Sequence, residues 1–294
     1  MTGKTPGGPI LTLGLWKTAI AGVHSLHSDG LQATGRRARM FIGQRWFGNV
    51  PDFTQHRYVL SERIARECDY TVANGPFTGL ELSRDSWWSA ADRGMMLLGY
   101  YEAEVLAQLA DLCDGAAWLI DIGAADGYYA VGAVKAGLVP SAVCFEMSAE
   151  GRSVIQSNSA MNGVSDEIVV LGLAGRNFLD EIPPEAWSED RPAVFLFDIE
   201  GGEFDLLTED VLRRLRWSSL IVEIHEPIRA KERRADSLIE RASKYFDVQI
   251  ITTGARDPSA CQLLELWSDD DRWLLCSESR TYLMRWMVLT PKRG

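Results

Sequence analysis

Short apolar runs alternate with amphipathic stretches through the last two thirds of the chain. The runs have the length of buried strands, and the stretches between them have the 3.6-residue period of surface helices. The predicted strands are 118–123, 142–146, 168–171, 193–199, 220–225, 248–252 and 282–289. The predicted helices are 97–112, 127–136, 149–161, 204–215 and 232–246. This alternation predicts an α/β fold with a mostly parallel, Rossmann-like sheet that has helices on both faces.

The pattern divides the chain into three segments. Residues 1–68 show helical patterning broken by Gly-rich turns, which predicts an N-terminal helical extension. Residues 69–115 contain a hairpin-like alternation around Asn74-Gly75-Pro76 and the helix that leads into residues 116–294, the α/β domain. The apolar stretch at 9–23 is too short to span a bilayer. It predicts an amphipathic helix that docks on the body or on a second copy in a homodimer, with a membrane-surface helix as the alternative.

Charge and cysteine content narrow the function classes. The 294-residue chain carries 41 acidic and 30 basic residues, a net charge of −11. Proteins that neutralise nucleic-acid phosphates normally present a basic face, so we expect no nucleic-acid partner. The five cysteines are scattered without a CxxC pair, which indicates neither a zinc ribbon nor a disulfide framework and fits a cytoplasmic location.

The loop after the first predicted strand carries the first candidate chemistry. Gly123 and Gly127 allow a sharp turn and a close approach of the backbone to a ligand. The loop lacks the second and third glycines of a dinucleotide fingerprint. Asp121 and Asp126 would repel a pyrophosphate, whereas they suit a cofactor that carries an ammonium and a sulfonium group. The sequence therefore favours S-adenosyl-L-methionine over NAD, although Asp126 as a simple helix cap is the alternative.

The second predicted strand ends in an acid, as many nucleoside-binding folds do. Glu146 follows the glycine loop by about 20 residues, where a carboxylate accepts both hydroxyls of an adenosine ribose. Met147 comes next and is expected to lie against the adenine. A surface acid at a strand end is the alternative for Glu146.

Acidic residues and a histidine end the fourth and fifth strands. Because residues two apart share a strand face, Asp198 and Glu200 should point the same way, as should Glu223 and His225. A hydroxyl that attacks a methyl group must lose its proton, so Asp198, His225 and Glu200 are the candidate catalytic residues. Asp198 is expected to lie nearest the transferred methyl group and to contact the cofactor, and a purely structural role is the alternative for His225. Glu203 is interpreted as a helix cap. The same residues could gather around a divalent cation, but no ligand spacing requires one and no metal is predicted.

Five segments together resemble the FkbM-type methyltransferases, a class I family that depends on S-adenosylmethionine. The segments are 98–102, 121–129, 145–146, 197–203 and 220–226, and the Asp198-Ile199-Glu200-Gly201 stretch within 197–203 is the most specific. The resemblance implies a Rossmann-like domain with an antiparallel last strand. It adds Glu102, Ala124 and Tyr128 to the expected cofactor contacts. It also implies methylation of a hydroxyl on a small molecule, secondary metabolite or glycan, with S-adenosyl-L-homocysteine as product.

Three hypotheses remain open at this point. The first is the O-methyltransferase, with N-methylation as a variant. The second is a non-catalytic module that binds S-adenosylmethionine or a nucleoside. The third is a nucleotide-dependent dehydrogenase, which requires a phosphate-friendly loop that this chain lacks.

Overall fold

A computed structural model describes residues 52–227, 230–231, 233–280 and 282–292. The chain divides into two units, Met1–His56 and Arg57–Gly294, and the elements described here lie in the second, apart from the first residues of α3. The amphipathic helix predicted at 9–23, and with it the predicted dimer contact, lies outside the described residues. Within the described ranges, no helix is long and apolar enough to cross a membrane.

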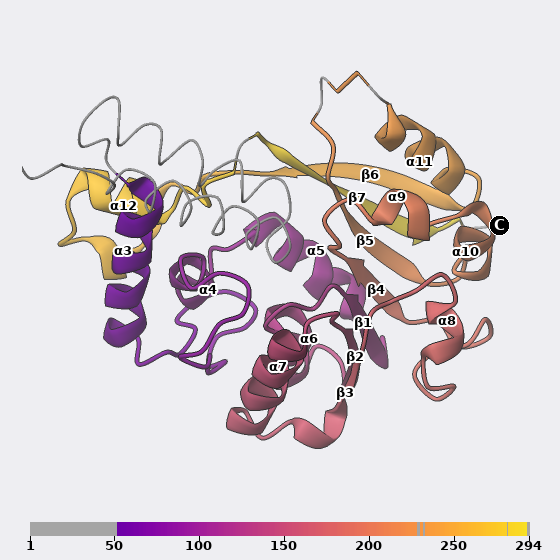
Figure 1. The fold of residues 1–294 in the computed structure, drawn as a ribbon, viewed down its shortest axis with the longest axis horizontal. Helices are drawn as coiled ribbons and strands as arrows, with labels where there is room; N and C mark the ends of the chain where they lie inside the picture. The colour runs from indigo at the N-terminus through magenta and orange to yellow at the C-terminus, as the bar shows by residue number, and fades with distance from the viewer. Residues whose placement is uncertain (1–51, 228–229, 232, 281, 293–294) are drawn as a thin grey trace, which may run out of the picture. The chain divides into compact units, whose positions relative to one another are not determined.

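The strands form one seven-stranded sheet in the order β3-β2-β1-β4-β5-β7-β6 (Figure 1). Neighbours from β3 to β5 are parallel, whereas β7 runs antiparallel to both β5 and β6. The strands are β1 (Trp118–Ile122), β2 (Ser141–Phe145), β3 (Ile168–Leu171), β4 (Val194–Phe197), β5 (Ser219–Ile224), β6 (Phe246–Thr253) and β7 (Met284–Pro291). The predicted fold class is confirmed: a mostly parallel, Rossmann-like sheet with an antiparallel last strand and helices on both faces.

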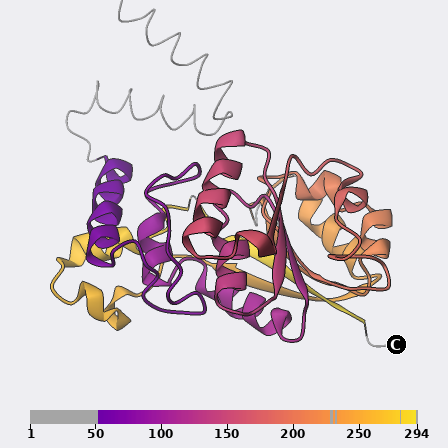
Figure 2. The ribbon, with the colours of Figure 1, turned by 90° about the horizontal axis from the view of Figure 1, so that it is seen from below.

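Helices cover both faces of this sheet. Among the described elements, α5, α6 and α7 lie on one face, and α8, α9, α10 and α11 lie on the other (Figures 1 and 2). The helices are α3 (Phe53–Glu67), α4 (Arg93–Leu98), α5 (Ala103–Cys113), α6 (Tyr128–Lys135), α7 (Ala149–Met161), α8 (Phe178–Glu181), α9 (Glu203–Leu206), α10 (Glu209–Arg214), α11 (Arg234–Ala242) and α12 (Asp269–Leu275). Single 3-10 turns occur at Ser165–Glu167, Pro258–Ala260 and Gln262–Leu264.

The apolar strand residues divide between two hydrophobic cores. On β1, Ile120 and Ile122 join the core under α8 to α11, whereas Leu119 joins the core under α5 and α6. Successive strand residues point to opposite faces, and both faces are buried here. This is why the central strands read as continuous apolar runs rather than as alternating ones. The polar residues that interrupt these runs stand at the carboxyl ends of the strands, where parallel sheets bind ligands.

Two predicted helices are each split in two. The helix predicted at 97–112 is interrupted after α4, because Gly99 adopts a left-handed φ of 74° and closes that helix. The helix predicted at 204–215 is interrupted between α9 and α10, where the Thr208 side chain accepts the amide hydrogen of Val211 and starts a new helix. In both cases local capping overrides a continuous apolar period.

Other predicted elements are shorter or simpler than expected. The hairpin-like segment 69–83 forms a single bridge between Thr71 and Glu81 instead of a strand pair. The helix predicted at 232–246 begins at Arg234 and ends at Ala242, and the last strand is displaced by two residues, to Met284–Pro291. Helices α8 and α12 have too few residues to show a period and were not predicted.

Candidate functional site

The loop between β1 and α6 turns sharply at a glycine. Gly123 has a φ of 91°, and a Cβ added there would lie 1.9 Å from the carbonyl oxygen of Asp198. The amides of Gly123 and Ala124 donate to the carbonyl of Phe145, at 2.9 and 3.0 Å. The loop is therefore hydrogen-bonded to the end of β2 and packs closely against the backbone after β4, in a path that only glycine permits at position 123.

Asp121, on β1, is a buried carboxylate without a side-chain partner among the described residues. It is 1% exposed, and within those ranges no side chain donates a hydrogen bond to either of its oxygens. Burial raises the pKa of Asp121 to about 7, and the amide of Ala130 in the first turn of α6 lowers it only in part. An ionised carboxylate in such a position is costly unless a positive group or hydrogen-bond donors are supplied from outside the protein.

Glu146 follows β2 and holds the glycine loop. One of its carboxylate oxygens accepts the amide of Ala125 at 2.9 Å, and the other accepts the amide of Ser148 at 2.6 Å. Beside it, Met147 is 73% exposed, and Leu173, two residues after β3, is 66% exposed. The carboxyl ends of β2 and β3 therefore present a buried acid next to two exposed apolar side chains.

The other predicted loop residues face the protein. The carboxylate of Asp126 accepts the hydroxyl of Ser86 and the amides of Trp87 and Trp88, so it binds the preceding segment of the chain. Tyr128 is buried, and its ring packs edge-on against Phe77 at a centroid distance of 5.2 Å. Both side chains thus already have protein partners. Their expected contacts with a cofactor remain predictions.

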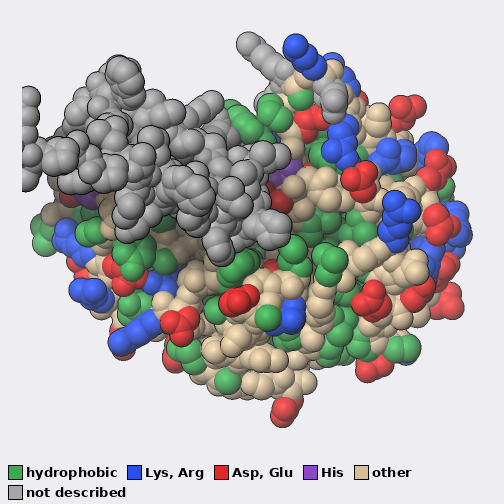
Figure 3. Space-filling model, in the orientation of Figure 1, with side chains coloured by type: hydrophobic (Ala, Val, Ile, Leu, Met, Phe, Trp, Pro, Cys, Tyr) green, Lys and Arg blue, Asp and Glu red, His purple; other side chains and the backbone are tan. Residues whose placement is uncertain are grey.

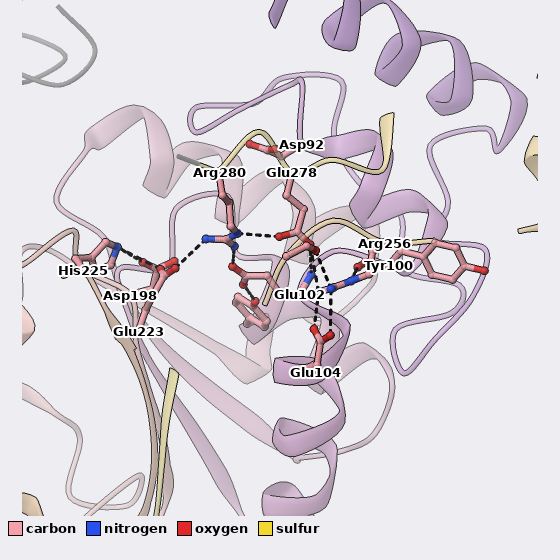
Figure 4. A network of polar contacts seen from close by, with 12 residues as sticks. Asp92, Tyr100, Glu102, Glu104, Asp198, Glu223, His225, Arg256, Glu278 and Arg280 are labelled. Atoms are coloured by element: carbon pink, nitrogen blue, oxygen red, sulfur yellow. Dashed lines mark hydrogen bonds and ion pairs between the residues drawn. The ribbon is translucent and has the colours of Figure 1, made fainter. Parts of the chain in front are cut away.

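Four carboxylates surround His225 at the ends of β4 and β5. Its Nε2 lies 3.2 Å from Glu223 Oε2, 3.5 Å from Asp198 Oδ1 and 3.7 Å from Glu200 Oε2. Its Nδ1 lies 3.4 Å from Oε1 of Glu203. The predicted residues are thus brought together, and Asp198, Glu223 and His225 point toward one another (Figure 4).

Glu203 has a larger role than the predicted helix cap. It is fully buried, and its carboxylate accepts the amides of Gly201 and His225, both at 2.9 Å. It therefore ties the turn after β4 to the end of β5. An acid directly after a Gly-Gly pair is typical of a helix start, and the sequence carries no local signal for the second contact, with the amide of His225.

The neighbouring carboxylates determine the protonation state of His225. Burial lowers the pKa of His225, but hydrogen bonding to Glu203 and Glu223 and the charge of Asp198 outweigh it and raise the pKa to about 12. The imidazole is therefore protonated at neutral pH and has no lone pair to accept a proton. Burial, with the neighbouring charge of Glu223, raises the pKa of Asp198 well above its usual range. Asp198 is the member of the cluster best suited to take up a proton.

A metal ion is an alternative centre for the same cluster. One ligand atom each from Asp198, Glu223 and His225 lies within 4.8 Å of the others, which is a spacing that a metal ion could bridge. The protonated imidazole already supplies a positive charge to these carboxylates. The geometry alone therefore does not require a cation there.

Arg280 links the cluster to the segment before β1 (Figure 4). Its guanidinium donates to Glu223 Oε1 at 3.0 Å, to Glu278 at 2.8 Å and to the carboxylate of Glu102, which also accepts the hydroxyl of Tyr129. Burial raises the pKa of Glu278 to about 8, although Arg256 lowers it. Glu102, predicted as a cofactor contact, is therefore engaged in a buried ionic network, and Arg280 was not predicted because no local pattern marks it.

Backbone strain also occurs at the same place. Glu102, Ala125 and Glu200 have φ values of 46°, 50° and 53°, a left-handed conformation that non-glycine residues rarely adopt. All three belong to the segments that meet at this edge of the sheet. Strain of this kind persists where surrounding contacts enforce it, and it is often found at functional sites.

No family model and no curated protein matches this chain. Similar solved structures include precorrin-6y C5,15-methyltransferase from Geobacter metallireducens, which is 13% identical, with a TM-score of 0.46 and 72% of this chain and 94% of that chain covered. An O-methyltransferase from Bacillus cereus, in complex with SAH, is 14% identical, with a TM-score of 0.43 and 86% and 97% covered. The m1A22 tRNA methyltransferase TrmK from B. subtilis is 10% identical, with a TM-score of 0.41 and 63% and 64% covered. Likeness at these values concerns the course of the chain and identifies no activity.

Proposed function

We propose that this protein is an S-adenosylmethionine-dependent methyltransferase whose cofactor lies at the carboxyl ends of β1, β2 and β4. The observation that carries the proposal is the buried carboxylate of Asp121, which has no side-chain partner among the described residues and lies two residues before the turn at Gly123. A buried acid in this state calls for a positively charged ligand group. The ammonium of the methionyl moiety is such a group, and the residues present therefore fit this cofactor.

The charges of the site select against phosphorylated cofactors. Asp121 is a buried acid at the start of the loop, and its carboxylate would repel a pyrophosphate. The loop also has Ala125 where a dinucleotide fingerprint requires its second glycine. NAD-dependent chemistry is disfavoured on both grounds.

Glu146 and its neighbours are suited to the adenosine. Each carboxylate oxygen of Glu146 accepts one backbone amide and retains a lone pair for a ribose hydroxyl. Met147 and Leu173 are exposed apolar side chains after β2 and β3, and we expect them to contact the adenine. Gly123 and Ala124 would line the side of the methionyl moiety.

Asp198 is the proposed base. When bound, the cofactor supplies a methyl group on a positively charged sulfonium, and an attacking hydroxyl must give up its proton during or after transfer. Asp198 is partly exposed at the strand ends and has a raised pKa, whereas His225 is already protonated. In this proposal His225 holds the carboxylates in place, and the more exposed Glu200 orients the acceptor.

The proposed acceptor is a hydroxyl of a small molecule, secondary metabolite or glycan, as the resemblance to FkbM-type enzymes implies. On the face shown in Figure 3, the Lys and Arg side chains of the described residues are interspersed with Asp and Glu rather than gathered into a patch. This distribution supports a small acceptor over a nucleic acid. An amine acceptor would use the same residues and is the alternative.

Isothermal titration calorimetry tests the proposal directly. We expect S-adenosylhomocysteine and S-adenosylmethionine to bind and NADH not to bind. Tight binding of NADH without binding of S-adenosylhomocysteine would overturn the assignment. Binding without methyl transfer to any acceptor in a panel of hydroxyl and amine compounds would favour the non-catalytic module.

Replacing Glu146 with Gln should weaken cofactor binding. The amide keeps the shape of the side chain but replaces one acceptor oxygen with a donor, so it loses charge-assisted bonds to the ribose and one bond within the loop. We expect the Kd for S-adenosylhomocysteine to rise about 10- to 100-fold, equivalent to about 1.5–3 kcal/mol. Glu150→Gln, an exposed acid nearby on α7, is the control. An unchanged Kd in Glu146→Gln would remove the ribose assignment.

Asp121→Asn should have opposite effects on the free and the bound protein. The Asp121 carboxyl ionises near pH 4 in the unfolded chain and at about 7 in the folded one. The protonated carboxyl therefore favours the folded state fully below about pH 4. As the pH rises from 4 through 7, this contribution to the free energy of unfolding is lost, by roughly 4 kcal/mol at most. Above pH 7 the variant should thus melt at a higher temperature than the wild type but bind S-adenosylhomocysteine about tenfold more weakly or worse. Thermal melting from pH 5 to 8.5, with and without ligand, measures both effects. A variant that binds as tightly as the wild type would show that Asp121 does not contact the ammonium.

A further inference from the structure

Two adjacent tryptophans stand exposed beside the proposed cofactor site. Trp87 and Trp88 are 43% and 47% exposed, although indole rings are usually buried or held at an interface. They belong to a segment without regular secondary structure, between the Thr71–Glu81 bridge and α4. The proposed function does not yet use them.

The side chains of Asp126 and Asn158 hold this segment against the proposed site through hydrogen bonds. The amides of Trp87 and Trp88 donate to one oxygen of Asp126, at 2.8 and 3.3 Å. Asn158, on α7, accepts the amide of Ser83 at 2.7 Å and donates to the carbonyl of Asp126 at 2.8 Å. These bonds attach residues 83–88 to both the glycine loop and α7, and they give Asp126 a role that the sequence did not indicate.

The indole of Trp87 lies next to Glu146. A Cβ added to Gly151, in the first turn of α7, would lie 2.9 Å from Cδ1 of Trp87 and 2.8 Å from Cγ of Glu146. Both side chains therefore reach into the space that a larger residue at position 151 would occupy. The absence of a side chain there is what allows the ring and the carboxylate to approach each other.

We propose that Trp87 is a cofactor-binding residue, whose indole covers the ribose side of the site and packs against the adenosyl group of the ligand. This inference rests on the proposed function, because it takes Glu146 as the ribose-binding acid. An aromatic ring supplies a large, rigid apolar surface, and its face attracts a positive charge such as the sulfonium. Trp88, fixed by the same carboxylate, steadies the segment that carries Trp87.

The test compares variants in S-adenosylhomocysteine titrations. Trp87→Ala should raise the Kd about 5- to 30-fold, as expected for loss of one aromatic contact with a charged, partly apolar ligand. Trp217→Ala is the matched control, because Trp217 is 53% exposed and precedes β5, at the opposite, amino end of the strands. Its Kd should stay within twofold of the wild type, and thermal melting should show both variants folded.

Gly151→Ala tests the same contact without removing an aromatic ring. Alanine is the better helix former, so α7 should not weaken, but its methyl group must displace Trp87 or Glu146. We expect a weaker affinity of similar size to that of Trp87→Ala. Titration with ligand should also change the tryptophan fluorescence of the wild type, and this change should be much smaller in Trp87→Phe.

The outcomes separate the two proposals. Equal affinity of wild type and Trp87→Ala would overturn the inference about Trp87 and leave the cofactor assignment intact. If the wild type failed to bind S-adenosylhomocysteine at all, the proposed function and this inference would both be overturned.

Discussion

Asp198→Asn is expected to slow methyl transfer about 10²- to 10⁴-fold while leaving the Kd for S-adenosylhomocysteine within about threefold. Asparagine keeps the size and the acceptor oxygen of aspartate but cannot take up a proton. The loss should therefore fall on turnover, because ligand binding in the proposal depends mainly on Asp121 and Glu146. Initial rates with labelled S-adenosylmethionine and an acceptor identified by screening measure the first effect, and calorimetry measures the second.

The pH profile gives this prediction a second readout. A base must be deprotonated to act, and the pKa of Asp198 is raised by burial and by the charge of Glu223. The wild-type rate should therefore increase with pH through that raised pKa, and Asp198→Asn should lose this dependence. Glu200→Gln is the control, since Glu200 is the more exposed carboxylate, and its rate should fall less than tenfold. Full activity in Asp198→Asn would exclude it as the base.

Gly123→Ala is expected to abolish cofactor binding and to lower the free energy of unfolding by about 2–4 kcal/mol. The added methyl would lie 1.9 Å from the Asp198 carbonyl oxygen, so either β4 or the glycine loop must move. Because Asp198 belongs to the cluster around His225, the same displacement would also misplace the proposed base. Calorimetry with S-adenosylhomocysteine and urea unfolding followed by circular dichroism measure the two losses.

Gly115→Ala separates the steric effect from the backbone effect. Gly115 has a similar φ of 77°, but an added Cβ would meet nothing within 4 Å. Alanine at position 115 should lower the free energy of unfolding by about 1 kcal/mol, because it must adopt a left-handed conformation. It should leave ligand affinity unchanged. If both variants lost the same stability and Gly123→Ala still bound the ligand, the close packing of the loop on β4 would not matter for function.

The sequence predicted those parts of the fold that depend on local pattern. The run that became β1 was predicted at 118–123 and spans Trp118–Ile122, because a fully buried strand in a parallel sheet is uniformly apolar. The pairing of Glu223 with His225 on one face followed from the two-residue period of a strand. Helices were misjudged where Gly99 or Thr208 ends one turn and starts another within a single apolar period.

The parts that were missed depend on contacts between distant segments. Arg280 reaches Glu223 across 57 positions, and nothing near Arg280 in the sequence distinguishes it from a surface arginine. The strong rise in the pKa of His225 also could not be predicted, because it depends on Glu203 and Asp198 from a different strand end. Likewise, Asp126 was identified as a site residue, but its role in fastening Trp87 requires the folded arrangement.

The place of β7 has a consequence for the order of assembly. This strand follows β6 in the chain but separates it from β5, and among the described strands β6 pairs with β7 alone. Until β7 is in position, β5 has an unpaired edge and β6 has no strand with which to pair. The carboxyl-terminal region should therefore be among the last to acquire protection from hydrogen exchange. Folding intermediates should then expose the unpaired edge of β5 next to the incomplete cluster around His225, and self-association should be most pronounced at that stage.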